Sequence, residues 1–341
     1  MNEQSGTGEA TVSVLASLAE IGRADWDACA NPGWPSAASP GGIENPAIPY
    51  NPFISHDFLW SLEESGSANR KSGWLAQHLV LDGADGRPAA ILPAYLKSHS
   101  MGEYVFDHGW ADAYERAGGQ YYPKLQVAVP FTPVTGRRLL VRPGPDADRH
   151  RATLAAAAIA LARRHGASSI HATFLPEEEW EFLGAADYLK RTDQQFQFFN
   201  ENYRDFDDFL DALASRKRKN IRRERRDALA GGIEVEHLSG RDLTEGAWDA
   251  FFAFYMDTGA RKWGRPYLNR KFFSLVGERM ADRILLMLAK RNGRPIAGAL
   301  NFIGSDALYG RYWGATEEQP FLHFELCYYQ AMDLAIAHRL P

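Results

Sequence analysis

The chain has 341 residues, of which 45% are hydrophobic and 24% are charged. This composition is typical of a globular protein and excludes a fibrous or disordered chain, and the length favours two domains. The apolar runs are too short to span a bilayer, and the polar N-terminal residues do not resemble a signal peptide. The two cysteines, Cys29 and Cys327, form neither a disulfide framework nor a metal motif. The sequence therefore indicates a cytoplasmic protein with reduced thiols.

Charge is unevenly distributed along the chain. The formal net charge is −5, yet residues 216–226 contain eight basic side chains and one acid. A compact cationic segment in an otherwise acidic protein predicts an anion-binding helix. The alternative is a basic helix face that is only solvated. Because the chain has no other nucleic-acid-binding motif, we expect no DNA binding, while contacts to tRNA phosphates remain open.

Two segments far apart in the chain share one pattern. Residues 75–96 and 284–303 each contain an apolar run, a Gly-Arg-Pro tripeptide and a second apolar run. Glycine permits the backbone of a tight turn and proline fixes φ, so each segment is predicted to be a β-hairpin. The turns lie at Gly86–Pro88 and Gly293–Pro295. This repetition indicates an internal duplication.

The elements predicted around the two hairpins follow the same order. Helices precede them at residues 51–64 in the first copy and at 247–256 and 268–280 in the second. A strand and a helix follow them at 104–110 and 148–165 in the first copy and at 307–313 and 325–338 in the second. The first copy adds a strand at 168–174, a helix at 177–188 and a strand at 190–200.

This order predicts an α/β fold, in which each of two duplicated domains has a mixed sheet with helices on both faces. We place the domains at residues 1–202 and 203–341, and the second begins with a basic helix over 206–230. The second copy stops after its last helix, where the first copy continues through two more strands. Because the second sheet would then keep an unpaired edge, we expect the natural protein to continue beyond Pro341.

Three parts of the chain carry a resemblance to a known family. They are FDHGW at 106–110 with YYPKLQVAVPFTPVTGRRLL at 121–140, RKRKNIRRERRDA at 216–228 with FYMDTGARKWGRPYL at 254–268, and RYWGATEEQPFLHFELCYYQA at 311–331. In these segments the chain resembles the FemAB-like N-acyltransferases, a bacterial family associated with peptidoglycan biosynthesis and built from two GCN5-related N-acyltransferase (GNAT) domains.

This resemblance implies an enzyme that moves an acyl group from an activated donor, such as an acyl-CoA, to an amine. A cell-wall precursor is one possible acceptor. Two alternatives stay open at this point. One is aminoacyl transfer from tRNA, and the other is a protein without catalytic activity that recognises peptidoglycan or a protein partner.

The sequence does not show the coenzyme A loop of simple GNAT enzymes, in which backbone N–H groups at a helix start hold the pyrophosphate. The nearest cations are Arg137 and Arg138 in the first half, and Arg218 and Arg222 of the basic helix could also contact a phosphate. In the second half Glu325 stands in the first turn of the corresponding helix, where it would repel a pyrophosphate. No metal site is expected.

Direct acyl transfer to an amine needs a base for the ammonium proton and donors for the developing oxyanion. Glu325 and His323 lie at the predicted strand-to-helix junction of the second half, where either could serve as the base. Tyr312 on the preceding strand could donate to the oxyanion or the leaving group. The structural alternatives are a helix-end carboxylate, a turn histidine and a core aromatic ring.

Polar and aromatic residues gather in two regions and are candidates for substrate binding. In the first half Asp107, His108 and Trp110 end the predicted strand, and Tyr122, Thr132 and Thr135 lie in the long connection after it. In the second half Lys262, Trp263 and Tyr267 lie in a loop, and Arg311 and Trp313 close the strand before the junction. The alternative is that both regions are packed surface loops.

Overall fold

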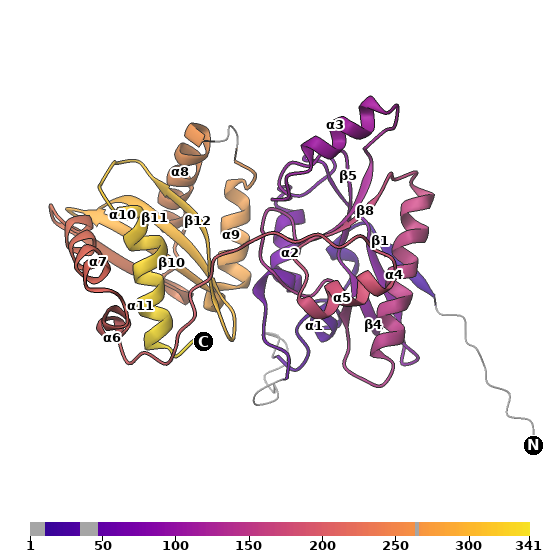
Figure 1. The fold of residues 1–341 in the computed structure, drawn as a ribbon, viewed down its shortest axis with the longest axis horizontal. Helices are drawn as coiled ribbons and strands as arrows, with labels where there is room; N and C mark the ends of the chain where they lie inside the picture. The colour runs from indigo at the N-terminus through magenta and orange to yellow at the C-terminus, as the bar shows by residue number, and fades with distance from the viewer. Residues whose placement is uncertain (1–10, 35–46, 263–265) are drawn as a thin grey trace, which may run out of the picture. The chain divides into compact units, whose positions relative to one another are not determined.

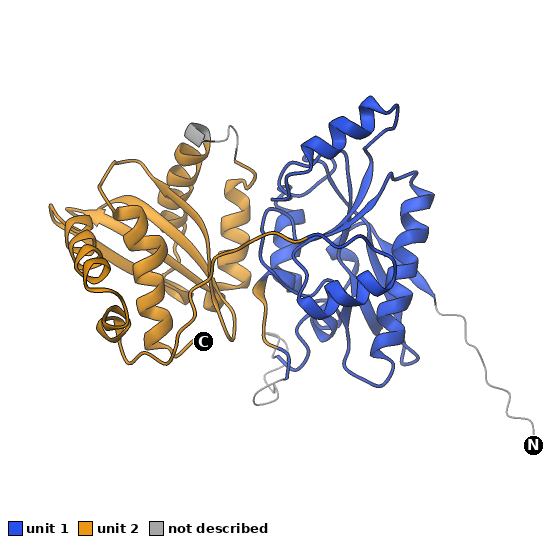
Figure 2. Cartoon of the chain, in the orientation of Figure 1, with its two compact units in different colours: residues 1–48, 53–191 blue, residues 49–52, 192–341 orange. Residues whose placement is uncertain are grey.

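The protein is described by a computed structural model that covers residues 11–34, 47–262 and 266–341. The chain divides into two compact units (Figure 2). Unit 1 comprises Met1–Ile48 and Phe53–Arg191, and unit 2 comprises Pro49–Pro52 and Thr192–Pro341. The division therefore falls before the predicted boundary at residue 202, and a short early segment belongs to unit 2. Within the described residues, no helix combines the length and the apolar character needed to cross a membrane.

Unit 1 contains two four-stranded sheets, in the orders β1-β3-β4-β7 and β2-β5-β6-β8. Its strands are β1 (Val12–Leu15), β2 (Trp74–Ala76), β3 (His78–Asp82), β4 (Pro88–Leu92), β5 (Ala94–Lys97), β6 (Lys124–Val127), β7 (Leu140–Val141) and β8 (Ile170–Ala172). One long hairpin links the two sheets. Strands β2 and β3 follow one another in its first arm, and β4 and β5 in its second. Gln77 N, between β2 and β3, donates to Ala94 O of β5 at 2.8 Å and joins the two arms where the sheets meet. Among the described strands of this unit, only β6 and β8 pair in parallel.

The helices of unit 1 are α1 (Arg23–Ala30), α2 (His56–Glu64), α3 (His108–Arg116), α4 (Ala147–Arg164) and α5 (Glu177–Ala185), as Figure 1 shows. The main core lies where α4 and α5 pack against strand residues, through side chains such as Leu154, Ala158 and Leu183. Residues Leu125 and Val127 of β6 point into this core. Short 3₁₀ turns of the chain lie at Leu18–Glu20, Pro52–Ile54, Gly240–Asp242 and Ala281–Arg283.

Unit 2 is built on one antiparallel sheet in the order β12-β11-β10-β9. Its strands are β9 (Ile233–Leu238), β10 (Ile284–Arg291), β11 (Arg294–Ile303) and β12 (Leu308–Ala315). Its helices are α6 (Phe206–Asp211), α7 (Ser215–Ala228), α8 (Glu245–Lys262), α9 (Arg270–Arg279), α10 (Leu322–Phe324) and α11 (Gln330–Ala337), with a π-helical turn at Glu325–Tyr329. Figure 1 shows α8 and α9 on one side of the sheet and α10 and α11 on the other.

The predicted internal repeat is visible in the element order. Both Gly-Arg-Pro tripeptides lie in antiparallel hairpins, β3–β4 and β10–β11. Both glycines adopt the left-handed backbone, with φ of 73° at Gly86 and 76° at Gly293. In each unit an edge strand, β1 or β9, pairs with the first hairpin strand, and two helices lie between them in the chain. The prediction of an α/β fold with matched hairpins is confirmed.

Three predicted elements are wrong. Residues 104–110 form no strand, because the hairpin itself continues past Pro93 as β5 and Asp107 instead precedes α3. Residues 190–200 also form no strand, and Phe196 in this stretch is 89% exposed rather than packed on a sheet. The predicted basic helix over 206–230 is two helices, because α6 ends at Asp211 and the extended backbone of Ala214, the N-cap of α7, separates them.

Gly314 of β12 sets how closely α8 approaches the sheet of unit 2. A Cβ at this position would lie 2.2 Å from the carbonyl group of Phe254 in α8. We expect Gly314→Ala to destabilise the protein by about 1–3 kcal/mol, because neither backbone can yield without disturbing the core. Urea unfolding measures the change. Gly246→Ala, at an unobstructed position of α8, is the matched control, and equal midpoints for the two variants would contradict this account of the packing.

Candidate functional site

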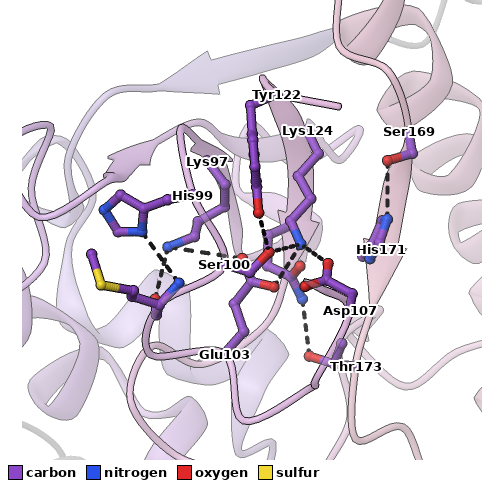
Figure 3. A network of polar contacts seen from close by, with 12 residues as sticks. Lys97, His99, Ser100, Glu103, Asp107, Tyr122, Lys124, Ser169, His171 and Thr173 are labelled. Atoms are coloured by element: carbon purple, nitrogen blue, oxygen red, sulfur yellow. Dashed lines mark hydrogen bonds and ion pairs between the residues drawn. The ribbon is translucent and has the colours of Figure 1, made fainter. Parts of the chain in front are cut away.

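The sheet β2-β5-β6-β8 of unit 1 has one apolar and one polar face. Leu125 and Val127 of β6 point into the core, so alternation turns their neighbours Lys124 and Gln126 to the opposite face. Lys97 of β5 is the register partner of Lys124, and His171 of β8 is that of Gln126. Four polar side chains from three strands thus lie on one face, and Figure 3 shows Lys97, Lys124 and His171 among them.

Lys124 is the centre of this polar network. Its side chain is fully buried, and its Nζ lies 2.5 Å from Asp107 Oδ2, 2.7 Å from Glu103 Oε2 and 2.8 Å from Ser100 Oγ. The rings of Tyr121 and Tyr122 approach the same ammonium group, with centroids 5.5 and 5.7 Å away. A buried ammonium group needs such counter-charges and hydrogen bonds.

Lys97 is the second buried cation of the network. Its Nζ lies 3.6 Å above the Trp74 ring, donates to Met101 O at 3.2 Å and lies 3.9 Å from Glu103 Oε1. Burial lowers the pKa of Lys97 to about 7, against the attraction of Glu103. Burial also raises the pKa of Glu103, although Lys124 opposes the change. Burial thus disfavours the charged form of both members of this pair.

Asp107 remains a carboxylate throughout the physiological range. Burial alone would raise its pKa, but hydrogen bonds from Lys124 and other neighbours outweigh burial and lower the pKa to about 2. Tyr121 OH donates to the same carboxylate at 2.8 Å, and burial together with this bond raises the pKa of the phenol. Tyr122 OH lies 2.7 Å from Ser100 Oγ. Asp107 and Tyr122, two of the predicted binding residues, thus lie in one cluster.

The other predicted binding residues of unit 1 lie apart from the Lys124 ammonium. Thr132 is buried, and its hydroxyl has no hydrogen-bond partner among the described residues. His108, Trp110 and Thr135 are exposed. Since no strand forms at 104–110, His108 and Trp110 sit on α3 and point to solvent.

Sequence reasoning missed the two lysines, Glu103 and His171. The available signal was a lysine at an alternating position of an apolar strand, as in the stretches around Lys97 and Lys124. A strand lysine is more often at a solvated position, so the pattern alone gives no reason to expect burial. Burial and then the nearby Lys124 charge lower the pKa of His171 to about 4, and Ser169 Oγ lies 3.0 Å from its Nε2.

Arg137 and Arg138, the predicted phosphate ligands of the first half, bind backbone carbonyl groups. Arg137 Nη2 donates to the carbonyl oxygens of Cys29 and Ala30. Arg138 is 1% exposed, and its guanidinium donates to backbone carbonyl groups, including Val134 O at 2.9 Å. Burial lowers its pKa to about 10. Both guanidinium groups thus help to hold the chain before β7.

A pyrophosphate does not fit the start of α4 either, the helix that follows β7. Its N-cap is Asp146, and Asp148 lies in its first turn. Two carboxylates at a helix N-terminus stabilise the helix and repel a bound anion. The residues present therefore do not match the coenzyme A loop of simple GNAT enzymes. Among the residues that the structure describes, no group of three or more histidine, cysteine and acidic side chains could hold a metal ion.

In unit 2, Glu325 is locked in an ion pair and is not placed to act as a base. Its side chain is fully buried, and Arg225 Nη2 and Nε donate to it at 3.1 and 3.2 Å. Gln330 Nε2 adds a bond at 2.7 Å. Of the two candidate bases at this junction, Glu325 points into the protein and His323 is exposed.

His323 stands on the outer side of the same helix start. Its ring centroid lies 5.1 Å from that of Trp313, 5.5 Å from Phe324 and 5.9 Å from Tyr328, each in an edge-on arrangement. The helix begins after Phe321, whose φ of 64° is left-handed, and continues into the π-helical turn. Such irregular backbone occurs most often at functional positions. An exposed imidazole held by three rings is therefore the best-placed titratable group at this junction.

A bulge in β12 changes the expected faces of its residues. The register shifts between Leu300 and Asn301, whose partners are Tyr312 and Gly310, so Arg311 lies at the irregularity. The Arg311 guanidinium is centred 5.1 Å from the Tyr312 ring, although simple alternation predicts opposite faces. Tyr312 itself is 8% exposed and packs edge-on against Tyr255 of α8, which gives it the core role rather than a place beside His323.

The remaining predicted residues of unit 2 add little to this junction. Tyr267 is 42% exposed. Trp263 lies outside the described residues, and so does the side chain of Lys262 at the end of α8. Trp313 is half-buried and supports His323, so this predicted binding residue lies beside a predicted catalytic residue.

The basic helix α7 has two different faces. Arg218 pairs with Asp211 and Arg222 with Asp207 of α6, each at 2.9 Å, and Arg225 pairs with Glu325. Arg218 and Arg222, the two cations of this helix predicted to contact a phosphate, are therefore each paired with an acid of α6. Those on the outer face are exposed and form no ion pair with any described residue. They are Arg216, Lys217, Lys219 and Arg223.

The shifted pKa of His171 predicts a pH dependence of stability. The folded protein keeps this imidazole neutral down to about pH 4, whereas the unfolded chain is protonated below its ordinary value of 6.5. Unfolding then takes up a proton, so stability should fall as pH decreases from 6.5 to 4, by at most about 1.4 kcal/mol per pH unit from this group. Urea unfolding at several pH values measures how the free energy of unfolding changes with pH. This dependence should be weaker in His171→Gln than in the native protein, and it should be unchanged in His338→Gln, which replaces an exposed histidine. Identical slopes in all three proteins would contradict the burial argument.

Comparisons with known proteins place these observations in a family. Curated proteins give no match to the sequence. Two solved structures are similar to the chain. One, a crystal structure of FemX, is 14% identical, covers 81% of this chain and 80% of its own, and has a TM-score of 0.46. The other is a tandem GNAT protein from the clavulanic acid biosynthesis pathway. It is 15% identical, the match covers 97% of this chain and 86% of the other, and the TM-score is 0.44. The FemAB-like family profile, described as peptidoglycan biosynthesis/recognition, matches residues 17–341, and the chain belongs to this family.

Proposed function

We propose that the protein transfers an acyl or aminoacyl group from an activated donor to an amine of a cell-wall precursor. Membership of a family described by peptidoglycan biosynthesis supports the acceptor class. The observation that carries the proposal is the exposed imidazole of His323, which Trp313, Phe324 and Tyr328 hold in place where β12 leads into α10.

The chemistry requires few groups. An amine attacks an activated carbonyl carbon directly, the bond to the donor's leaving group breaks, and the ammonium proton must pass to a base. Imidazole titrates near neutral pH, which suits it to accept this proton. Glu325 cannot take this role while Arg225 binds it. The aromatic rings around His323 restrict its orientation and offer flat surfaces to the substrate.

The outer face of α7 supplies the second part of the proposal. Four exposed cations without acidic partners among the described residues can contact the phosphates of a substrate or donor. Arg225 joins α7 to the start of the helix that carries His323, so both features belong to one region of unit 2. An aminoacyl-tRNA and an acyl-CoA both bring phosphates, and the two donors are separate arms of the test.

We expect His323→Asn to lower turnover by about 10²–10⁴-fold, the usual contribution of a general base. The assay supplies radiolabelled acyl-CoA or aminoacyl-tRNA as donor and a cell-wall precursor peptide with a free amine as acceptor. His338→Asn is the matched control, because this exposed histidine lies at the end of α11, remote in sequence from the junction. Full turnover by His323→Asn would show that His323 is not the base and that other residues carry the reaction. No turnover by the native protein with either donor would favour recognition without catalysis.

The two faces of α7 predict different salt effects. Lys219→Gln with Arg223→Gln removes two exposed cations, so the slope of log affinity against log salt for the phosphate-bearing donor should fall by about 2. Arg218→Gln with Arg222→Gln removes the same charge from the face that pairs with α6. This control should lower the stability of the protein and leave the slope of log affinity against log salt close to that of the native protein. Fluorescence titration of labelled tRNA or acyl-CoA at several salt concentrations measures the slopes. Equal slopes for both double variants would contradict the assignment of the outer face.

A further inference from the structure

The two buried lysines of unit 1 take their counter-charges from outside the sheet. Lys97 and Lys124 are register partners on β5 and β6, so the sheet fixes both ammonium groups side by side. The carboxylates that approach them belong to Glu103 and Asp107. Both acids lie in residues 98–123, the connection between β5 and β6, which also contains α3. The sheet therefore presents cations, and a connecting segment presents the anions.

The middle of this connecting segment packs loosely on unit 1. Its helix α3 buries Ala111 alone, and Trp110 and Tyr114 on it are 70% and 47% exposed. Nearer the two ends of the segment, the carbonyl oxygen of Gly102 accepts from Phe131 N at 3.1 Å and that of Pro123 accepts from Ser168 N at 2.9 Å. A Cβ at Gly102 would lie 2.6 Å from the Phe131 ring, and its φ is 80°. Few buried apolar contacts make a segment easy to detach.

Several buried polar atoms around the lysine pair lack hydrogen-bond partners among the described residues. They are Trp74 Nε1, Glu103 Oε1, Asp107 Oδ1 and Gln126 Oε1. Each of these side chains is at most 3% exposed. An unsatisfied buried polar atom is costly, and native structures hold few of them. Trp74 and Gln126 belong to the sheet, whereas Glu103 and Asp107 belong to the connecting segment, so each side of this contact keeps hydrogen-bonding capacity that the other side does not use.

We propose that the Lys97–Lys124 pair is a binding site for a small dianion, a dicarboxylate or a diphosphate, and that Glu103 and Asp107 occupy this site as internal substitutes. This site lies in unit 1 and is independent of the reaction proposed for His323. The ligand would replace the two carboxylates and release the connecting segment from the sheet.

The exchange follows from the electrostatics of the lysines. A buried ammonium group without a counter-ion is strongly unfavourable, so the segment cannot leave while both lysines stay charged and unpaired. Burial lowers the pKa of Lys97 to about 7, which shows how weakly Glu103 compensates it at 3.9 Å. A ligand that brings one anionic group to each lysine would compensate both, and Trp74 Nε1 could donate to it.

The test uses the full chain and thermal unfolding. Glu103→Gln with Asp107→Asn removes the internal anions, so the variant should melt below the native protein. Saturating inorganic pyrophosphate or succinate should then raise its melting temperature by about 5 °C or more, the shift expected at roughly 100 times the Kd. The two probes distinguish a phosphate from a carboxylate ligand. Sodium chloride at the same ionic strength measures the nonspecific effect of salt.

The matched control is Glu179→Gln, which removes another buried carboxylate of unit 1, one that accepts from Arg138 N and Leu139 N rather than from a lysine. This control should not respond to either anion. Adding Lys97→Met to the double variant should abolish its response. Equal shifts in the double variant and the control, or a response that survives Lys97→Met, would overturn the proposal.

A second variant keeps the test valid if the double variant does not fold. Gly102→Ala changes no charge but should lift the connecting segment, because its Cβ would collide with the Phe131 ring. We expect pyrophosphate or succinate to raise its melting temperature more than that of the native protein. Hydrogen exchange in residues 98–107 should also be faster in this variant and faster still with the anion. Unchanged exchange and an equal anion response in Gly102→Ala and native protein would refute an exchangeable segment.

Discussion

The buried ammonium group of Lys124 constrains most of unit 1. Because β6 packs Leu125 and Val127 against the helical core, strand geometry sends the lysine to the opposite face, away from water. It can remain charged there only beside carboxylates, which Glu103 and Asp107 provide. Asp107 makes no capping bond to α3, although it stands at the N-cap position. The lysine thus decides where the chain between β5 and β6 must run.

A buried carboxylate plays the corresponding part in unit 2. Glu325 lies at the start of the last helical stretch, beside the buried Leu322 and Leu326, and it must reach a cation to be buried. Arg225 meets it, and this ion pair ties α7 to the helix that follows β12. Since Glu325 points inward, His323, two residues earlier, is left on the exposed side. Removing one partner from such a pair typically costs about 3–5 kcal/mol, so the pair fixes where His323 stands.

The sequence predicts the fold better than it predicts the site. The hairpins at Gly86 and Gly293 could be predicted because turn chemistry is local and two residue types determine it. The role of Glu325 could not be predicted. A carboxylate in the first turn of a helix can interact with the helix dipole, act as a base or form a buried ion pair, and the local sequence is the same in all three cases. Its partner Arg225 lies 100 residues away, and no local pattern marks that contact.

Irregular backbone limits prediction in the same way. Alternation places Arg311 and Tyr312 on opposite faces, but the bulge opposite Leu300 and Asn301 breaks the rule where the candidate residues begin. The left-handed backbone of Phe321 and the π-helical turn after it have no characteristic residue types by which the sequence could reveal them. Lys97 and Lys124 are hidden for another reason. Their burial depends on a connecting segment that packs over them, and strand periodicity carries no information about that segment.

The location of the partner acids determines which cations in the two units can bind a ligand. In unit 2, Glu325 is anchored by a helix that packs its own leucines into the core, so the Arg225 pair cannot exchange without unfolding that helix. Only the opposite face of α7 remains open to anions. In unit 1 the acids lie on a segment with few buried contacts, and the lysines lie on a rigid sheet. The same pairing of buried charges is therefore permanent in unit 2 and replaceable in unit 1, a difference that net charge along the sequence cannot reveal.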